Sequence, residues 1–456
     1  MKNYKRGIIS MSIILMLSLI CLNSTFAFEI NDDLNLPDGN INDDLNLQNE
    51  DDLLSEDAKT FAMLNEDING NSDEEINLTS DYTFNNQTDK QDVGLLIRGI
   101  TISRKLTING NGHTLDGSDV ARFFLITDSS LNVVFKDLIF INGHAHDGGA
   151  ISGNSISYNC TFINNRAQFF GGAIYKGSAV NCTFEGNNAS EGGAIYVNTN
   201  HAVIEDCTFE WNIADESGGA ISIDSTVNTT LANCTFHKNS AKTGGAISLS
   251  YSRYASISNS TFNENNVTEN GGAIYSDFAV NCLIDNCGFE GNQTLLNGGA
   301  FAWVYSYGNI TNNNFKRNKA TGNGGALFIN IANTTTMVHN QVLSNCNFTS
   351  NHATGDGGAI YNNDFYIIRD AFFYFENNGA EGNGGAIYCK DSCKISNFTF
   401  IDNRAGENGG AVYCHDYCNF SYSTFTDNHV EETVVQFMPM IILLSIVLTL
   451  RIISHM

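Results

Sequence analysis

The chain has 456 residues, of which 16% are charged, and its formal net charge is −26. This charge excludes a nucleic-acid binder that is driven by overall charge, because a polyanion would be repelled. Two prolines and 42 glycines argue against collagen and against Pro-rich disorder. A hydrophobic content of 42% is enough for a large core.

Residues 1–27 are predicted to be a secretory signal peptide. Lys2 and Lys5 make the start positive, an apolar run follows over residues 8–22, and Ala27 offers a small residue for cleavage. An uncleaved membrane anchor is the alternative. Cleavage would place the rest of the chain outside the cell.

Residues 28–90 are predicted to form a flexible acidic linker. They contain 18 Asp or Glu residues and only two lysines, Lys59 and Lys90. Low hydrophobicity with one sign of charge leaves little apolar surface to offset the entropy of ordering. Calcium binding by the Asp-Asp pairs is an alternative to a solvated spacer.

A repeat occupies most of the remaining chain. The string Gly-Gly-Ala occurs eleven times between Gly148 and Gly409, at a mean spacing of about 26 residues. A phenylalanine lies eight or nine residues before each string, and three residues after the phenylalanine comes an asparagine, except for Gly143 in the first unit. The residue after each Gly-Gly-Ala is always apolar.

This period predicts an all-β fold, a single-stranded parallel β-helix (solenoid) of about 14 coils over residues 91–433. Residues such as Cys182, Thr183 and Phe184 alternate between apolar and polar, which is the spacing of a strand. Stacked coils would place Phe on Phe inside and the repeated Asn in a ladder. The extra residues between Phe328 and Asn345 predict an outward loop.

The Phe-x-x-Asn and Gly-Gly-Ala-Ile pairing resembles the repeat of chlamydial polymorphic membrane proteins. Together with the sequence from Leu106 to Gly117, it resembles more closely the adhesin-like surface proteins of methanogenic archaea. The resemblance covers residues 94–430 and implies a right-handed β-helix that is displayed on the cell surface and serves attachment. The repeat breaks off after Asn428, and no autotransporter-type barrel sequence follows it.

One set of tyrosines shares a slot that is expected to face outward and to align from coil to coil. Such rings can stack on sugars, and ordinary packing between coils is the alternative. The set is Tyr175, Tyr196, Tyr275, Tyr361, Tyr388 and Tyr413.

The cysteines fall into two groups. Six of them precede the repeat Phe by two residues and predict a stack of buried free thiols, with disulfides between neighbouring coils as the alternative. These are Cys160, Cys182, Cys207, Cys234, Cys287 and Cys346. Cys389, Cys393, Cys414 and Cys418 lie on adjacent coils and predict disulfides more than a zinc site, because the protein is expected to be exported.

Catalytic residues would have to break the repeat, because paired carboxylates or a base beside acidic ligands need a special geometry. The candidates cluster near the first coils, although polar residues on a solvent face give the same pattern. They are His113, Asp116, Asp119, Arg122, Asp137, His144, His146 and Asp147. We expect no catalytic site, no metal and no cofactor.

Residues 434–456 form a hydrophobic tail. No charge occurs between Phe437 and Leu450, which indicates a membrane anchor or the end of a truncated chain. Sequons such as Asn159 and Asn181 fit a glycoprotein or simply follow from the repeat.

The sequence therefore favours a membrane-anchored, extracellular adhesin-like protein that binds glycans or a partner cell and does not bind nucleic acid. A secreted polysaccharide lyase or hydrolase and a passive stalk of the cell envelope are the alternatives. The sequence leaves the oligomeric state open.

Overall fold

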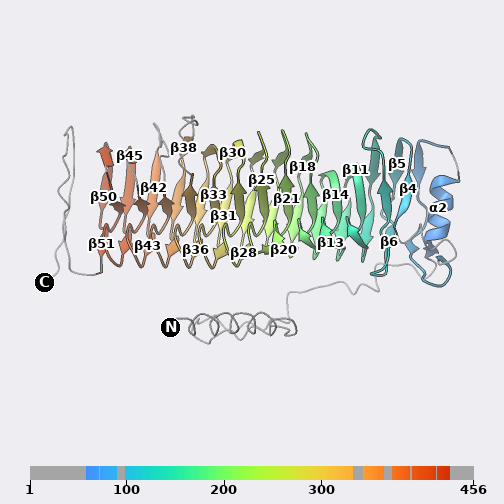
Figure 1. The fold of residues 1–456 in the computed structure, drawn as a ribbon, viewed down its shortest axis with the longest axis horizontal. Helices are drawn as coiled ribbons and strands as arrows, with labels where there is room; N and C mark the ends of the chain where they lie inside the picture. The colour runs from blue at the N-terminus through green and yellow to red at the C-terminus, as the bar shows by residue number, and fades with distance from the viewer. Residues whose placement is uncertain are drawn as a thin grey trace, which may run out of the picture. The chain divides into compact units, whose positions relative to one another are not determined.

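The computed structural model describes residues 58–70, 72–89, 98–331, 342–363, 372–390, 393–416 and 418–431. In these residues the chain winds in successive coils, and equivalent strands of neighbouring coils pair in parallel (Figure 1). One coil from the middle contains the strands β19 (Thr208–Glu210), β20 (Ile213–Ser217), β21 (Ile221–Asp224) and β22 (Thr230–Ala232).

The coils build four rows of strands. The phenylalanine sheet has 15 strands from β1 (Lys59–Thr60) to β50 (Thr424–Thr426), and the short-strand sheet has 12 strands from β10 (His144–Asp147) to β51 (His429–Val430). The strand after each Gly-Gly-Ala, such as β21, belongs to the isoleucine row. The strand before the next Phe, such as β22, belongs to the fourth row. The number of strands in these two sheets confirms the predicted β-solenoid of about 14 coils.

The repeat phenylalanines form one continuous stack inside the phenylalanine sheet. From Phe140 to Phe425, the ring centroids of neighbouring coils lie 4.7–5.0 Å apart, with nearly parallel planes. The isoleucine row supplies the facing surface, with Ile195, Ile221 and Ile247 fully buried. Each coil is too thin to bury these side chains alone, so the core exists only because the coils stack.

The repeat asparagines form a buried ladder where the phenylalanine sheet turns into the short-strand sheet. Asn239 is typical: its Oδ1 accepts hydrogen bonds from the backbone N and from Nδ2 of Asn212, each at 3.0 Å. Its Nδ2 donates to the Phe209 carbonyl at 2.9 Å and to Oδ1 of Asn265 at 3.1 Å. Every hydrogen-bonding position of this buried amide is therefore used, which removes the cost of burying it.

The glycine pair permits the turn from the short-strand sheet into the isoleucine row. Gly218 has a φ of 65°, which side chains disfavour, and a Cβ there would collide with the Ile221 carbonyl. A Cβ on Gly219 would collide with the carbonyl of Gly245 in the next coil. Both positions thus require glycine, one for its backbone angle and one for the close approach of coils.

The N-terminal end corrects one prediction. The helix α2 (Phe61–Asn69) and the strands β1, β2 (Glu75–Asn77) and β3 (Tyr82–Thr83) occupy part of the stretch predicted to be a linker. β2 pairs with β5 (Leu106–Asn109), and β3 pairs with β6 (Thr114–Asp116), so the solenoid begins before residue 91.

The helix α2 closes the N-terminal end of the core (Figure 1). Phe61, Leu64 and Ile68 are fully buried, and the Phe61 ring lies 5.6 Å from that of Phe123. The buried carboxylate of Asp89 accepts hydrogen bonds from the first backbone N–H groups of the helix. The linker prediction failed here because averaging charge over the acidic stretch hid a short apolar stripe.

Several other predictions concern residues outside the described part. These are the signal peptide, the linker up to residue 57, most of the loop before Asn345 (residues 332–341) and the tail over residues 434–456. β34 (Tyr307–Thr311) still pairs with β38 (Val342–Ser344) across that insertion, so the register resumes after it. The described residues contain no helix that is long and apolar enough to span a membrane.

We expect Asn239→Ala to lower the free energy of unfolding by at least about 2 kcal/mol, because it leaves buried groups of Asn212 and Phe209 without partners. Urea denaturation of the purified chain measures this. Asn263→Ala, at a partly exposed outward position of β27 (Thr261–Asn263), is the control and should change stability by less than about 0.5 kcal/mol. Equal effects of both variants would contradict the structural role of the ladder.

Candidate binding surfaces

The six predicted tyrosines share one register position in the isoleucine row, but they do not form one continuous stripe. Tyr175 and Tyr196 stack at 5.8 Å, and Tyr361, Tyr388 and Tyr413 stack at 4.8 and 5.2 Å. The slot holds serine or alanine in several coils between these groups, and Tyr275 stands there alone.

These tyrosines are half-buried or buried. Tyr196 is 6% exposed, its ring lies 4.5 Å from that of Phe170, and its hydroxyl donates to Asp224 at 3.2 Å. Burial and the nearby carboxylates raise the pKa of Tyr196 well above its usual range. Contacts within the chain thus occupy much of the ring surface at this slot.

A different set of aromatic side chains is exposed, which the sequence analysis missed. Tyr251, Phe278 and Tyr305 lie where the isoleucine row turns into the fourth row, at the ends of β25 (Ile247–Ser250), β29 (Ile274–Asp277) and β33 (Phe301–Val304). Their rings stack at 5.2 and 5.0 Å across three coils. With the neighbouring Tyr254 they form what we call the aromatic corner, whose side chains are 42–60% exposed.

The backbone at this corner is strained. Tyr251, Phe278 and Tyr305 have φ values of 50°, 52° and 47°, in the left-handed region where glycine and asparagine are preferred. Bulky residues are outliers there, and such outliers concentrate at functional sites. A sequence signal existed, because each of the three lies seven residues after the first glycine of its Gly-Gly-Ala string.

The cysteines before the repeat Phe are buried free thiols. They hydrogen-bond along the stack, because the backbone N of Cys182 donates to Sγ of Cys207 and the Cys182 thiol donates to the Val180 carbonyl. Ser260 fills the slot in the same way, accepting from the backbone N of Cys234. Cysteine and serine in this slot thus both donate and accept, so the thiols serve structure, whereas Leu138, Phe373 and Phe398 fill the same slot of other coils with apolar side chains.

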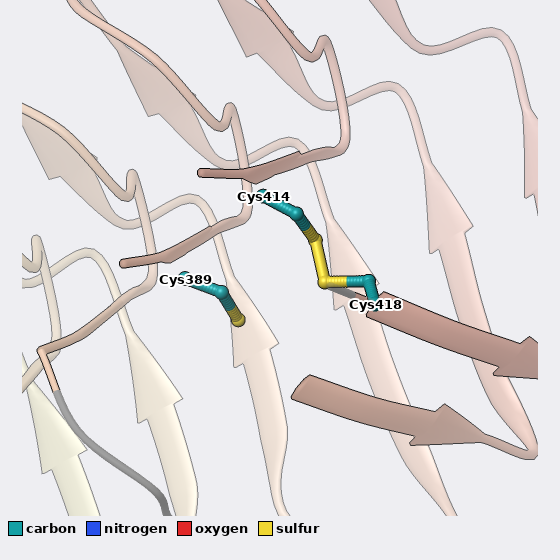
Figure 2. A group of neighbouring side chains, drawn as sticks. All are labelled: Cys389, Cys414 and Cys418. Carbon is teal, nitrogen blue, oxygen red and sulfur yellow. A yellow bond between two sulfur atoms is a disulfide. The ribbon is translucent and has the colours of Figure 1, made fainter. Parts of the chain in front are cut away.

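Two disulfides lie in the last two described coils, Cys389–Cys393 and Cys414–Cys418. Cys389 pairs in register with Cys414, and Cys393 with Cys418, so the bonds stack on each other. Figure 2 shows Cys389 beside the bonded pair, and the sulfurs of Cys389, Cys414 and Cys418 lie within 4.8 Å of one another. In the oxidised form these sulfurs are not thiolates, so the arrangement clamps the chain and does not offer ligands to zinc.

The structure separates three of the candidate catalytic residues, His113, Asp116 and Asp137, from the others. Nδ1 of His113 lies 3.0 Å from Asp81, and the buried Asp116 accepts hydrogen bonds from Ser118 and Asn142. Asp137 accepts from Asn159 at 3.2 Å. These groups hold the turns between neighbouring coils together.

The remaining candidates come together beside the short-strand sheet. Arg122 is 8% exposed, and its guanidinium donates to the backbone carbonyls of Gly148, Arg98 and Asp147. Burial lowers the pKa of Arg122 to about 10, which still leaves the side chain charged at neutral pH. Nδ1 of His144 lies 2.9 Å from the Asp119 carbonyl, and Nδ1 of His146 lies 2.8 Å from the Asp147 carboxylate.

The chain matches two family models. The model of the right-handed beta helix region matches residues 192–373, and the Chlamydia polymorphic membrane protein repeat matches residues 159–176, 181–198, 372–390 and 397–415. No curated protein matches the sequence. The matches agree with the coil architecture and confirm the predicted right-handed parallel β-helix with repeats of the polymorphic membrane protein kind.

One solved structure with a similar course of the chain is described as a new PL6 alginate lyase complex with trisaccharide. It has 15% sequence identity and a TM-score of 0.45, and the match covers 85% of this chain and 90% of that chain. At this level the likeness supports no inference about activity.

We expect stability to fall at alkaline pH because of the buried thiols. Burial raises the pKa of Cys282 to about 11 and those of Cys287 and Cys346 to about 12, whereas an unfolded thiol ionises near pH ~8.5. The contribution of these thiols to the free energy of unfolding is thus complete below pH ~8.5, and it is lost as the pH rises through the folded-state pKa values. Urea titrations at increasing pH measure the slope.

The variant Cys287→Ser tests the cause, since Ser260 fills the equivalent slot naturally. It should reduce the alkaline loss of stability relative to the wild-type chain. An identical pH profile for both proteins would contradict the assignment.

Proposed function

We propose that this protein is a non-catalytic, adhesin-like protein of the cell surface that attaches to glycans or to other cells through its β-helix. The repeats of the polymorphic membrane protein kind support a surface location. The tail over residues 434–456 would supply the anchor and the signal over residues 1–27 the export. The aromatic corner is the observation that carries the binding function.

Exposed aromatic side chains in a contiguous group are unusual on a soluble surface and mark interaction sites. Tyrosine combines a flat apolar face with a polar hydroxyl and loses little entropy on binding. The stacking of Tyr251, Phe278 and Tyr305 makes a ridge across three coils, which suits the ring faces and hydroxyls of sugars. The solenoid holds this ridge rigid because every strand below it is paired on both sides.

The enzyme and the passive stalk remain competing functions, and they predict different results. An enzyme would release fragments from a polysaccharide, and a stalk would retain no ligand. The dispersal of His113, Asp116 and Asp137 into turn contacts favours binding without chemistry.

The test is to incubate the full chain with a panel of plant, microbial and host glycans and to score retention and released fragments together. We expect retention without fragments. The triple variant Tyr251→Asn, Phe278→Asn, Tyr305→Asn should lower the affinity for retained glycans at least ~10-fold, if each aromatic contact contributes about 0.5–1.5 kcal/mol. Asparagine tolerates the left-handed backbone of this corner, so the variant should stay folded.

The control is Trp211→Asn, which removes an exposed aromatic with a φ of 56° from a different corner. It should leave glycan affinity unchanged. Fragments that appear during incubation, or full retention by the triple variant, would contradict the proposal.

A further inference from the structure

A groove on the outside of the short-strand sheet gathers positive charge on a chain whose net charge is −26. It measures about 620 Å³ and lies over the N-terminal coils. Its polar lining comprises Arg98, Arg122, His144, His146, Arg166, Gln168, Asn188 and Asp215.

The groove runs along the stack. β10 pairs with β13 (Arg166–Phe170), β13 with β16 (Asn188–Glu191), and β16 with β20. His144, Arg166 and Asn188 share one outward register position, so successive coils place one polar side chain after another at a spacing of about 4.8 Å. This arrangement suits an extended polymer that lies along the axis.

The arginines of the groove lack a close carboxylate partner in the part of the chain that the structure describes, although the nearby Asp147 carboxylate partly offsets the charge of Arg122. Within the described residues, Arg98, Arg122 and Arg166 form no ion pair, whereas the exposed Lys105, Lys242 and Arg404 each pair with a glutamate. Arg122 is almost fully buried, and the partners of its guanidinium are backbone carbonyls. Burial lowers the pKa of Arg122 despite this carboxylate, so the charged guanidinium remains costly to bury, and an anionic ligand would offset that cost.

The two histidines of the groove can hydrogen-bond to hydroxyl groups of a ligand. Nδ1 of His144 faces a carbonyl and Nδ1 of His146 faces a carboxylate, and these oxygens accept hydrogen bonds. With Nδ1 directed at these oxygens, Nε2 is the ring atom that can hydrogen-bond to a ligand hydroxyl. The partly exposed Phe169 ring lies 4.5 Å from that of His146 and adds an apolar surface.

We propose that this groove binds a segment of an anionic polysaccharide along the axis of the β-helix. Arg98, Arg122 and Arg166 take its carboxylate or sulfate groups, and the histidines, Gln168 and Asn188 take its hydroxyls. Asp215 accepts a hydrogen bond from a ligand hydroxyl, and its carboxylate disfavours a ligand with negative charge at that position. The site is separate from the aromatic corner and does not depend on it.

The experiment measures binding to the full chain by calorimetry with four probes: an oligogalacturonate, its fully methyl-esterified form, a chondroitin sulfate oligosaccharide and oligoglutamate. We expect at least one of the two anionic sugars to bind at least ~10-fold more tightly than the neutral ester and than oligoglutamate. The anionic sugar that binds more tightly shows whether the groove recognises carboxylate or sulfate groups. Its affinity should fall with salt, because charge contributes to it.

The variant Arg98→Gln, Arg166→Gln should weaken binding of that sugar at least ~10-fold and flatten its salt dependence. Lys319→Gln is the matched control, because Lys319 is exposed in β36 (Lys319–Ala320) at the same register position farther along the sheet. It should change affinity less than ~2-fold. The triple variant of the aromatic corner should bind the anionic sugar normally, which separates this proposal from the preceding one.

Three results would overturn the proposal. The first is no binding of either anionic sugar by the wild-type chain. The second is equal affinity for oligoglutamate, which would show attraction of any polyanion. The third is unchanged affinity of the double arginine variant.

Discussion

The buried asparagine ladder is the interaction on which this architecture depends. Each amide inside the ladder bonds to the amides and backbone of the adjacent coils, so its hydrogen bonds depend on asparagines in the same register on both sides. A slip of one residue in the register would leave several buried polar groups without hydrogen-bond partners, each at a cost of about 1–3 kcal/mol. Hydrophobic stacking of phenylalanines holds the coils together, and the ladder specifies how they align.

Because the inward positions are fixed by stacking, variation concentrates on the outside and at the ends. The left-handed corners mostly carry asparagine, aspartate or glycine, which adopt that backbone at little cost. Aromatic residues at Tyr251, Phe278 and Tyr305 depart from this rule where exposed apolar surface appears. The N-terminal groove is a second departure from the regular repeat, because Arg98 and Arg122 precede the first repeat unit and come together with Arg166 of a later unit. Both surfaces are therefore placed by a rigid scaffold.

The periodic part of the fold was predictable because each inward position repeats the same physical demand. Phenylalanine, asparagine and the glycine pair recur at fixed distances, and the structure places all of them as the spacing predicts. The stack of buried thiols was also predictable, since the sequence fills this slot mostly with small or apolar side chains, as expected of an inward position.

The rest could not be predicted from the period. The helix α2 occurs once, at the end of the stack, so no repeated pattern predicts it. Its apolar residues Phe61, Leu64 and Ile68 lie within an acidic stretch, whose average composition indicates a linker. The predicted tyrosine slot is outward in register, yet neighbouring side chains cover it, which depends on contacts between coils. The groove joins Arg98, Arg122 and Arg166 from different coils, so its charge appears only after stacking.

The most direct test is hydrogen exchange of the asparagine side-chain amides, measured by nuclear magnetic resonance on the folded chain. The account predicts that the amides of the ladder, such as Asn239 and Asn265, exchange as slowly as backbone amides of the core strands, because both need the coils to separate. Partly exposed asparagines such as Asn263 should exchange rapidly. Rapid exchange of the ladder amides in a folded chain would contradict the claim that they hold the coils in register.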